Sequence, residues 1–233
     1  MDHAVFYSNI RRSIFGGSLS QSAVDNINAI LAFWDQAHAG NPLGQLAYIL
    51  ATVRAEVGLK MAPVRETFAN SDAQARARLA HKPYAQSVPP HGHAYYGRGY
   101  VQLTWHRNYE RQEAKLGVPL VAEPDLALRA EVAIQVLVGG MMAGDFNGHG
   151  HGLPHYVNAT HQDFVEARRT VNVLDRAHEI ADYATRFLDA LERAVEAETI
   201  PTESLTRDGD LPPLRPSPEH LAAQHELIER DPH

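Results

Sequence analysis

Residues 43–68, LGQLAYILATVRAEVGLKMAPVRETF, carry the pattern that decides the fold of this chain. In the first fifteen of these residues the apolar side chains recur three and four positions apart with alanines between them, which predicts a mostly buried helix. A glycine and a proline then interrupt the helical pattern. Glu56 lies in the last turn of the predicted helix, and Glu66 lies just beyond the break. The stretch therefore predicts a core helix with one carboxyl group at its end and a second on the segment that follows.

Two carboxyl groups in different surroundings are what hydrolysis of a glycosidic bond needs. One must protonate the leaving oxygen, and the other must activate water or attack the sugar. Glu56 has apolar neighbours in sequence, and partial desolvation favours the protonated form that a general acid uses. Along an unbroken helix Glu66 would lie about 15 Å away, so the break at Gly58 and Pro63 is needed to bring it back across a cleft. Most glutamates are simply solvated, and the spacing alone leaves that interpretation open.

Helical periodicity continues through much of the remaining chain. Ser20 is a good N-cap for a helix over residues 21–37, and apolar residues recur at helical spacing over 131–142, 162–170 and 176–197. Prolines, glycines and histidines dominate residues 82–93, which predicts an irregular loop before the aromatic segment 95–109. Helices are therefore expected to outnumber strands heavily.

The bulk properties exclude several classes of protein. The chain has 233 residues, no cysteine and a formal net charge of −7. Disulfide frameworks, thiolate metal sites and cysteine nucleophiles are therefore ruled out, and an acidic chain without a basic stripe is not expected to bind nucleic acid. No segment has the roughly 20 apolar residues of a membrane span, and the N-terminus lacks the apolar run of a secretion signal. We therefore expect synthesis in the cytoplasm and no insertion into a membrane.

The composition changes near the C-terminus. Residues 199–233 are rich in Pro, Thr, Asp and Arg, and such a segment buries too little apolar surface to offset the entropy of the chain. This predicts a flexible tail. Within it, Ser217 can cap a short helix over residues 218–230, although isolated helices of this length are marginal in water.

Two motifs carry a resemblance to a known family. AYILATVRAEVGLKMAPVRETF at residues 47–68 and YYGRGYVQLTWHRNY at residues 95–109 resemble glycoside hydrolase family 19, in particular its phage and prophage endolysin-like branch. The resemblance continues through LVAEPDLAL, GGMMAGDF, ARRTVN and DRAHEIADYA and covers most of residues 5–190. It implies a mainly α, lysozyme-like fold in a catalytic domain of residues 1–198. Two helical lobes would enclose a substrate cleft, with a short-stranded segment around residues 95–104.

The resemblance also implies roles for individual residues. The family uses one glutamate as the general acid and a second, downstream glutamate as the base that activates water, with inversion at the anomeric carbon. These roles correspond to Glu56 and Glu66. The sugar groove of the family corresponds here to Tyr96, Gln102, Thr104, Asn108 and Asn172. Amide and hydroxyl groups suit that role because they both donate to and accept from sugar hydroxyls.

Other residues of the aromatic segment leave alternatives open. Tyr95, Trp105 and Tyr109 either pack in the core or present their faces to sugar rings. Arg98 lies between two glycines, and we expect it to be a buried ion-pair partner.

The sequence departs from the family pattern beside the acid. The family motif has histidine before the acid and threonine after it, whereas Ala55 and Val57 flank Glu56 here. The change removes polar groups that could orient the carboxyl group, so activity could be reduced, shifted in pH or absent.

Histidines invite a metal interpretation at two places. His149, His151 and His155 cluster in NGHGHGLPHY, and His91 and His93 lie in the irregular loop. The sequence fixes no carboxylate or fourth ligand beside either group, so we expect no functional metal and no cofactor.

The function expected from the sequence is hydrolysis of β-1,4 linkages in bacterial peptidoglycan by a monomeric, endolysin-like enzyme. It would act at the cell wall after a holin-type or other export route opens the membrane. Two alternatives stay open. One is a chitinase acting on chitin oligomers, because both polymers share the sugar backbone. The other is a catalytically impaired wall-binding or structural phage protein.

Overall fold

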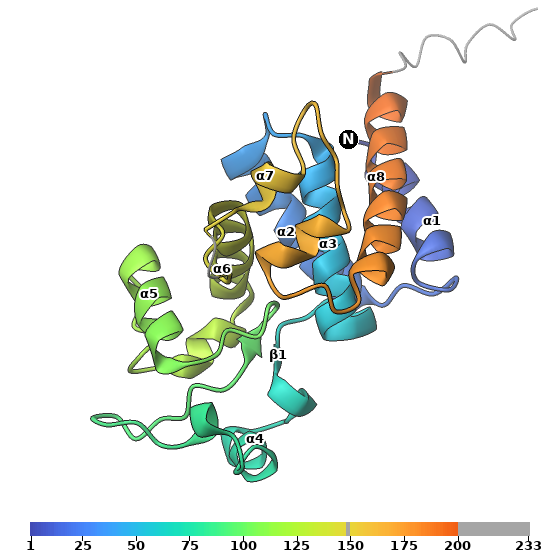
Figure 1. Ribbon diagram of the computed structural model, residues 1–233. Helices are drawn as coiled ribbons and strands as arrows, with labels where there is room; N and C mark the ends of the chain where they lie inside the picture. The colour runs from blue at the N-terminus through green and yellow to red at the C-terminus, as the bar shows by residue number, and fades with distance from the viewer. Residues whose placement is uncertain (148–149, 200–233) are drawn as a thin grey trace, which may run out of the picture. The chain divides into compact units, whose positions relative to one another are not determined.

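Figure 1 shows the computed structural model, which describes residues 1–147 and 150–199. The α-helices are α1 (His3–Ser13), α2 (Gln21–His38), α3 (Leu43–Val57), α4 (Asp72–Arg78), α5 (His106–Leu116), α6 (Ala130–Ala143), α7 (Leu153–Tyr156) and α8 (Ala177–Thr199). The 3-10 helices are η1 (Gly58–Lys60), η2 (Glu66–Phe68), η3 (Pro83–Ala85), η4 (Pro124–Leu128) and η5 (Glu166–Thr170). The strands are β1 (Val64–Arg65) and β2 (Arg98–Gly99). The mainly helical fold expected from the sequence is confirmed.

Helix α3 is the core helix that its sequence predicts. Almost all of its residues are buried, including Tyr48 and Leu50, and it packs against α2 and α6. It ends at Val57 because Gly58 adopts a positive φ of 78°, a conformation that glycine reaches without steric cost. The predicted start of α2 is also confirmed, since the Ser20 hydroxyl accepts the N–H of Ala23.

The helix predicted over residues 162–170 is the main difference. Gln162 pairs in an isolated β-bridge with Val157, and helical turns form only from Glu166 to Thr170. Asp163 explains the late start, because its carboxylate accepts the backbone N–H groups of Val165 and Glu166 and caps the turn. From residue 200 on, the predicted tail and its short helix lie outside the described residues.

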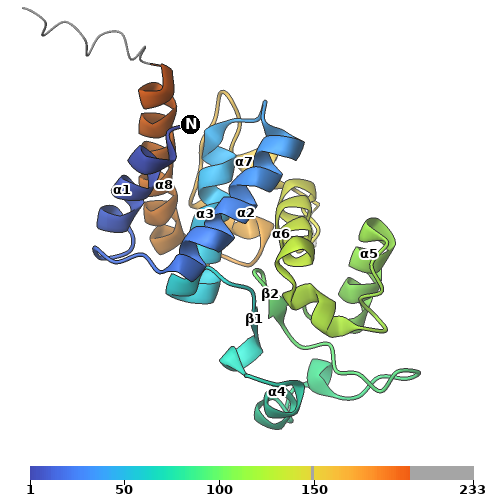
Figure 2. The same cartoon turned by 180° about the vertical axis from the view of Figure 1, so that it is seen from behind.

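The strands β1 and β2 join two groups of buried side chains. They pair antiparallel, with Val64 opposite Gly99 and Arg65 opposite Arg98. The larger hydrophobic cluster includes buried apolar side chains of α2, α3, α6 and α8, and the smaller one consists of Ala69, Ala75, Leu79, Ala85, Ala94 and Tyr96. Both views show β1 between α3 and α4 (Figures 1 and 2). These two clusters agree with the two lobes implied by the resemblance, and β2 is the short-stranded segment.

Arg98 of β2 is the buried ion-pair partner that its position between two glycines predicts. Its side chain is 2% exposed, and it forms ion pairs with Asp72 at 3.2 Å and with Asp125 at 2.8 Å. It also donates to the Tyr109 hydroxyl, and its guanidinium lies 3.7 Å from the centre of the Tyr96 ring. One side chain thus links β2 to α4, η4 and α5.

Among residues 1–147 and 150–199, no helix combines the length and the apolar surface that a bilayer-spanning segment requires.

Replacing Arg98 by methionine is expected to lower the free energy of unfolding by about 3–5 kcal/mol, because two aspartates lose their buried partner and the buried carbonyls of Ala94 and Tyr96 lose a donor. Urea denaturation followed by circular dichroism measures this loss. Arg193→Met is the control, because Arg193 also pairs with an aspartate, Asp189, but on the surface of α8. We expect its unfolding midpoint to stay close to that of the unchanged protein. Equal midpoints for the two variants would contradict the structural role of Arg98.

Candidate active site

Five of the seven predicted site residues line one cavity of about 320 Å³. They are Glu56, Glu66, Gln102, Thr104 and Asn172, and the apolar side chains in the lining are Val101 and Val171. The residues come from the end of α3, the start of η2, the segment after β2 and the segment after η5. The fold therefore brings together polar groups that are up to 116 positions apart in sequence (172 − 56).

Glu56 reaches the cavity from the last turn of α3. Its side chain is 20% exposed, so it is partly desolvated, as the sequence predicts. The structure adds a partner that the sequence reasoning missed. Nη1 of Arg168, whose side chain is 3% exposed, lies 2.8 Å from Oε1 of Glu56. The surroundings of Glu56 are therefore not simply apolar, and the carboxyl group is held by a buried guanidinium.

The segment that carries Arg168 also supplies Asn172. The Nε of Arg168 donates to the carbonyl of Asp175 at 2.9 Å, and the Arg168 carbonyl accepts the N–H of Asn172 at 3.0 Å. This turn fixes both side chains relative to each other. Arg168 lies in the motif ARRTVN, and an arginine among Ala167, Thr170 and Val171 was the available sign of a buried cation.

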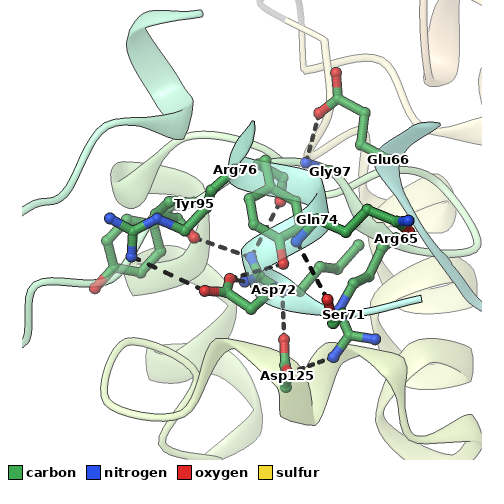
Figure 3. A network of polar contacts seen from close by, with 12 residues as sticks. Arg65, Glu66, Ser71, Asp72, Gln74, Arg76, Tyr95, Gly97 and Asp125 are labelled. Atoms are coloured by element: carbon green, nitrogen blue, oxygen red, sulfur yellow. Dashed lines mark hydrogen bonds and ion pairs between the residues drawn. The ribbon is translucent and has the colours of Figure 1, made fainter. Parts of the chain in front are cut away.

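Glu66 is held by hydrogen bonds to both of its carboxylate oxygens. The backbone N–H of Gly97 donates to Oε2 at 2.8 Å, and the hydroxyl of Tyr84 donates to Oε1 at 2.7 Å. The Glu66 backbone N–H donates in turn to the carbonyl of Gly97, so the β1–β2 pairing sets its position. Figure 3 shows the Glu66 carboxylate directed at the backbone nitrogen of Gly97. The break after α3 thus returns Glu66 to the cavity that Glu56 lines, as its proposed role requires.

Gly97 is required by the close packing around Glu66. A Cβ atom at this position would lie 2.7 Å from Oε1 of Gln102 and 3.2 Å from Oε2 of Glu66. Any side chain here would displace one of two cavity-lining groups. The backbone at Gly97 therefore follows a tight path beside the cavity.

The polar residues after β2 are positioned by backbone contacts. Gln102 has a positive φ of 55°, and its amide nitrogen donates to the carbonyls of Val64 and Gly99, both at 3.2 Å. Asn108 does not line the cavity. Its amide donates to the carbonyl of Thr104 at 2.8 Å, so it supports the backbone of a residue that does.

Tyr96 is placed differently from the expectation that it contacts sugar. Its side chain is fully buried, its hydroxyl donates to Asp72 at 2.8 Å, and Arg98 covers its ring. The structure therefore gives Tyr96 a packing role. Tyr95 and Tyr109 are likewise buried, whereas Trp105 is 41% exposed and is not a core residue.

Tyr84 is a site residue that the sequence reasoning did not identify. Burial, followed by the hydrogen bond to Glu66, raises the pKa of Tyr84 to about 12. Its hydroxyl therefore keeps its proton at neutral pH and can donate to the Glu66 carboxylate. The ring of Trp105 lies 5.4 Å from that of Tyr84 in an edge arrangement. No sign of this role is visible in the sequence, because Tyr84 lies in the irregular, proline-rich loop and belongs to no recognisable motif.

The two departures from the family motif have structural roles. The carbonyl of Ala55 accepts from Nη1 of Arg176 at 2.9 Å, which satisfies one of the free carbonyls at the end of α3. Val57 is 4% exposed and packs in the larger hydrophobic cluster. Neither residue supplies a polar side chain to Glu56, and Arg168 is the group that orients it.

No group of three or more His, Asp or Glu residues suited to a metal ion occurs in the described part of the chain. His91 and His93 stack with ring centres 6.0 Å apart, and His151 and His155 lie 4.2 Å apart. His149 lies outside the described residues.

Comparison with known proteins identifies similar sequences and folds. Residues 61–143 match the family described as class I chitinases, glycoside hydrolase family 19. Endochitinase At2g43620 of Arabidopsis thaliana is 37% identical over 70 residues, which is 30% of this chain and 24% of that protein. Endochitinase At2g43610 of the same plant is 36% identical over 64 residues, or 28% of this chain and 22% of that protein. The match therefore spans about a quarter of the length of these relatives.

Solved structures show the same fold. Chitinase C of Streptomyces griseus HUT6037 superposes with a TM-score of 0.53 at 22% identity, covering 82% of this chain and 76% of that one. A bacterial family 19 chitinase superposes with a TM-score of 0.56 at 23% identity, covering 82% of this chain and 94% of that one. The lysozyme-like fold implied by the resemblance is thereby confirmed.

Replacing Tyr84 by phenylalanine removes the hydrogen bond to Oε1 of Glu66 and leaves the ring in place. We expect kcat for hydrolysis of a glycan substrate to fall about tenfold with KM unchanged, because small misplacements of a reacting group are costly. Steady-state kinetics on soluble glycan fragments measure both constants. Tyr7→Phe is the matched control, since the Tyr7 hydroxyl bonds to Asn28 and Val24 away from the cavity. If both variants lose kcat equally, Tyr84 does not act through Glu66.

Proposed function

We propose that this chain, which matches glycoside hydrolase family 19 over residues 61–143, hydrolyses β-1,4 linkages between N-acetylhexosamines, with peptidoglycan as its substrate. The observation that carries the proposal is that Glu56 and Glu66, from different segments, line the same cavity. Hydrolysis with a general acid and a general base needs two such carboxyl groups facing one substrate. The proposed place of action is the bacterial cell wall.

In the proposed mechanism Glu56 protonates the leaving oxygen and Glu66 activates water. Glu66 suits the base because Gly97 and Tyr84 donate to its oxygens and hold it as a carboxylate acceptor. When Glu56 gives up its proton it becomes an anion, and Arg168, at 2.8 Å, stabilises that anion. Water attacks from the opposite side to the acid, so the anomeric centre inverts.

The remaining cavity residues suit the binding of acetamido sugars. Thr104 offers a hydroxyl group, and Gln102 and Asn172 offer side-chain amides, each of which can pair with sugar hydroxyl or acetamido groups. Trp105, exposed beside Tyr84, offers an aromatic face on which a sugar ring can pack. These groups recognise the sugar backbone that peptidoglycan and chitin share.

Chitin is the second candidate substrate. The relatives in Arabidopsis thaliana are named endochitinases, and both structural neighbours are chitinases. The choice between the two polymers depends on groups outside the cavity, because they differ in the lactyl peptide that only peptidoglycan carries.

Replacing Glu56 by glutamine is expected to lower the rate of glycan hydrolysis by about 10²–10⁴-fold, because general acid catalysis is lost. The amide has nearly the shape of the carboxyl group and keeps a polar oxygen beside Arg168, so folding should be retained, which a thermal melt checks. Glu192→Gln on the exposed face of α8 is the matched control and should keep full activity. An active Glu56→Gln variant would remove Glu56 from the role of acid.

An inactive native chain that still binds the glycan would instead support the catalytically impaired, wall-binding alternative.

The substrate is tested by exposing permeabilised bacteria and colloidal chitin to the same amount of protein. We expect the turbidity of the bacteria to fall, with little release of chitooligosaccharides. Reducing-end analysis of the digested wall identifies the bond that is cleaved. Release of chitooligosaccharides without clearance of the bacteria would replace peptidoglycan by chitin as the substrate.

A further inference from the structure

Beside the segment that connects the two glutamates lies a larger cavity, of about 870 Å³. Its lining includes residues of β1 and η2 and the four consecutive residues Val57, Gly58, Leu59 and Lys60. It shares no described lining residue with the cavity of Glu56 and Glu66. We name this second cavity the basic hollow.

The charges in the basic hollow oppose the charge of the whole chain. Arg54, Lys60 and Arg65 line it, and no Asp or Glu occurs among its described lining residues. The chain as a whole carries a formal net charge of −7. The acidic chain as a whole repels an anion, whereas the cations of the basic hollow attract it.

The three cationic side chains differ in the partners that they contact. Arg65 pairs with Asp125 at 2.5 Å, whereas the guanidinium of Arg54 lies against the ring of Tyr183 at 5.0 Å. Lys60 is exposed and forms no ion pair within residues 1–147 and 150–199. Lys60 is thus the cation most available to an anionic ligand.

The basic hollow also has exposed apolar surface. Leu59 is 56% exposed and Phe68 is 64% exposed, and both line it. Large apolar side chains with this exposure beside cations suit a ligand that carries both carboxylates and aliphatic groups. A short peptide has this combination, and an unsubstituted neutral polysaccharide does not.

Lys60 of the basic hollow lies near Glu56 in sequence, so one substrate can reach both the basic hollow and the cavity of Glu56 and Glu66. Arg54 and Glu56 are two residues apart on α3, so they face different sides of the helix. Lys60 follows Glu56 by four residues, so their Cα atoms are at most about 15 Å apart. An extended peptide of five residues spans up to about 17 Å. A peptide branch on a sugar in the cavity can therefore extend to Lys60.

We propose that the basic hollow binds the carboxylate-bearing stem peptide of peptidoglycan while the glycan occupies the cavity of Glu56 and Glu66. This inference rests on the proposed function, since it names the part of the substrate that distinguishes peptidoglycan from chitin. Lys60 pairs with a carboxylate of the peptide, and Leu59 and Phe68 contact its alanine side chains. The basic hollow thereby selects the peptide-substituted polymer.

Binding to the Glu56→Gln variant tests the inference without catalysis. Isothermal titration compares soluble glycan fragments that carry stem peptides with the same fragments after an amidase has removed them. We expect tighter binding of the peptide-bearing fragments. Adding Lys60→Glu should weaken their binding about five- to tenfold and leave the peptide-free fragments unaffected. Lys82→Glu is the charge-matched control, because Lys82 lines neither cavity.

The outcomes separate this inference from the proposed function. Equal affinity for the two kinds of fragment, or equal weakening of both by Lys60→Glu, would overturn the role of the basic hollow. Hydrolysis by the unchanged protein could persist in that case, and the proposed function would stand. Failure of the unchanged protein to hydrolyse either fragment would instead overturn the proposed function. A preference that declines as salt is raised from low to high concentration is the further sign of an ionic contact.

Discussion

The candidate site depends on the contacts that the buried guanidinium of Arg98 makes. It holds Asp72 of α4, Asp125 of η4 and Tyr109 of α5 around β2. Gly97, the residue before it, binds both the backbone and the carboxylate of Glu66. Asp125 also pairs with Arg65 of β1, so the strands are joined by charge as well as by their hydrogen bonds. A two-stranded sheet this short needs such support, because isolated hairpins are marginally stable in water.

The two glutamates are positioned by different physical means. Glu66 receives neutral donors, a backbone N–H and the Tyr84 hydroxyl, which fix the direction of both of its oxygens. Glu56 instead forms an ion pair with Arg168, whose side chain is itself nearly buried. This difference suits unlike roles, because an acid that becomes an anion during the reaction gains from a nearby cation. The charged partner of Glu56 comes from η5, whereas Ala55 and Val57 beside it in α3 supply no polar side chain.

The proposed function places recognition of the sugar backbone and discrimination between polymers in different parts of the surface. The cavity of Glu56 and Glu66 offers amides and a hydroxyl, which suit sugar groups common to several polysaccharides. The basic hollow offers cations and exposed apolar side chains such as Phe68. The segment between the two glutamates borders the basic hollow and also leads to Glu66, so one short stretch of chain connects the two proposed binding sites.

The sequence by itself determined the helical core, and the family resemblance predicted five residues that line one cavity. The spacing of apolar residues predicted α3 to its last residue, and Gly58 ended it because of its backbone freedom. The predictions from the sequence did not include Arg168 or Tyr84, and they placed Tyr96 in the groove. All three side chains are positioned by contacts between distant segments, which leave no periodic pattern in the sequence. The predictions also overextended the helix at residues 162–170, where the Asp163 cap overrides helical spacing. Only the tertiary structure decided which polar groups meet, since burial and pairing depend on how α3, β2 and η5 pack together.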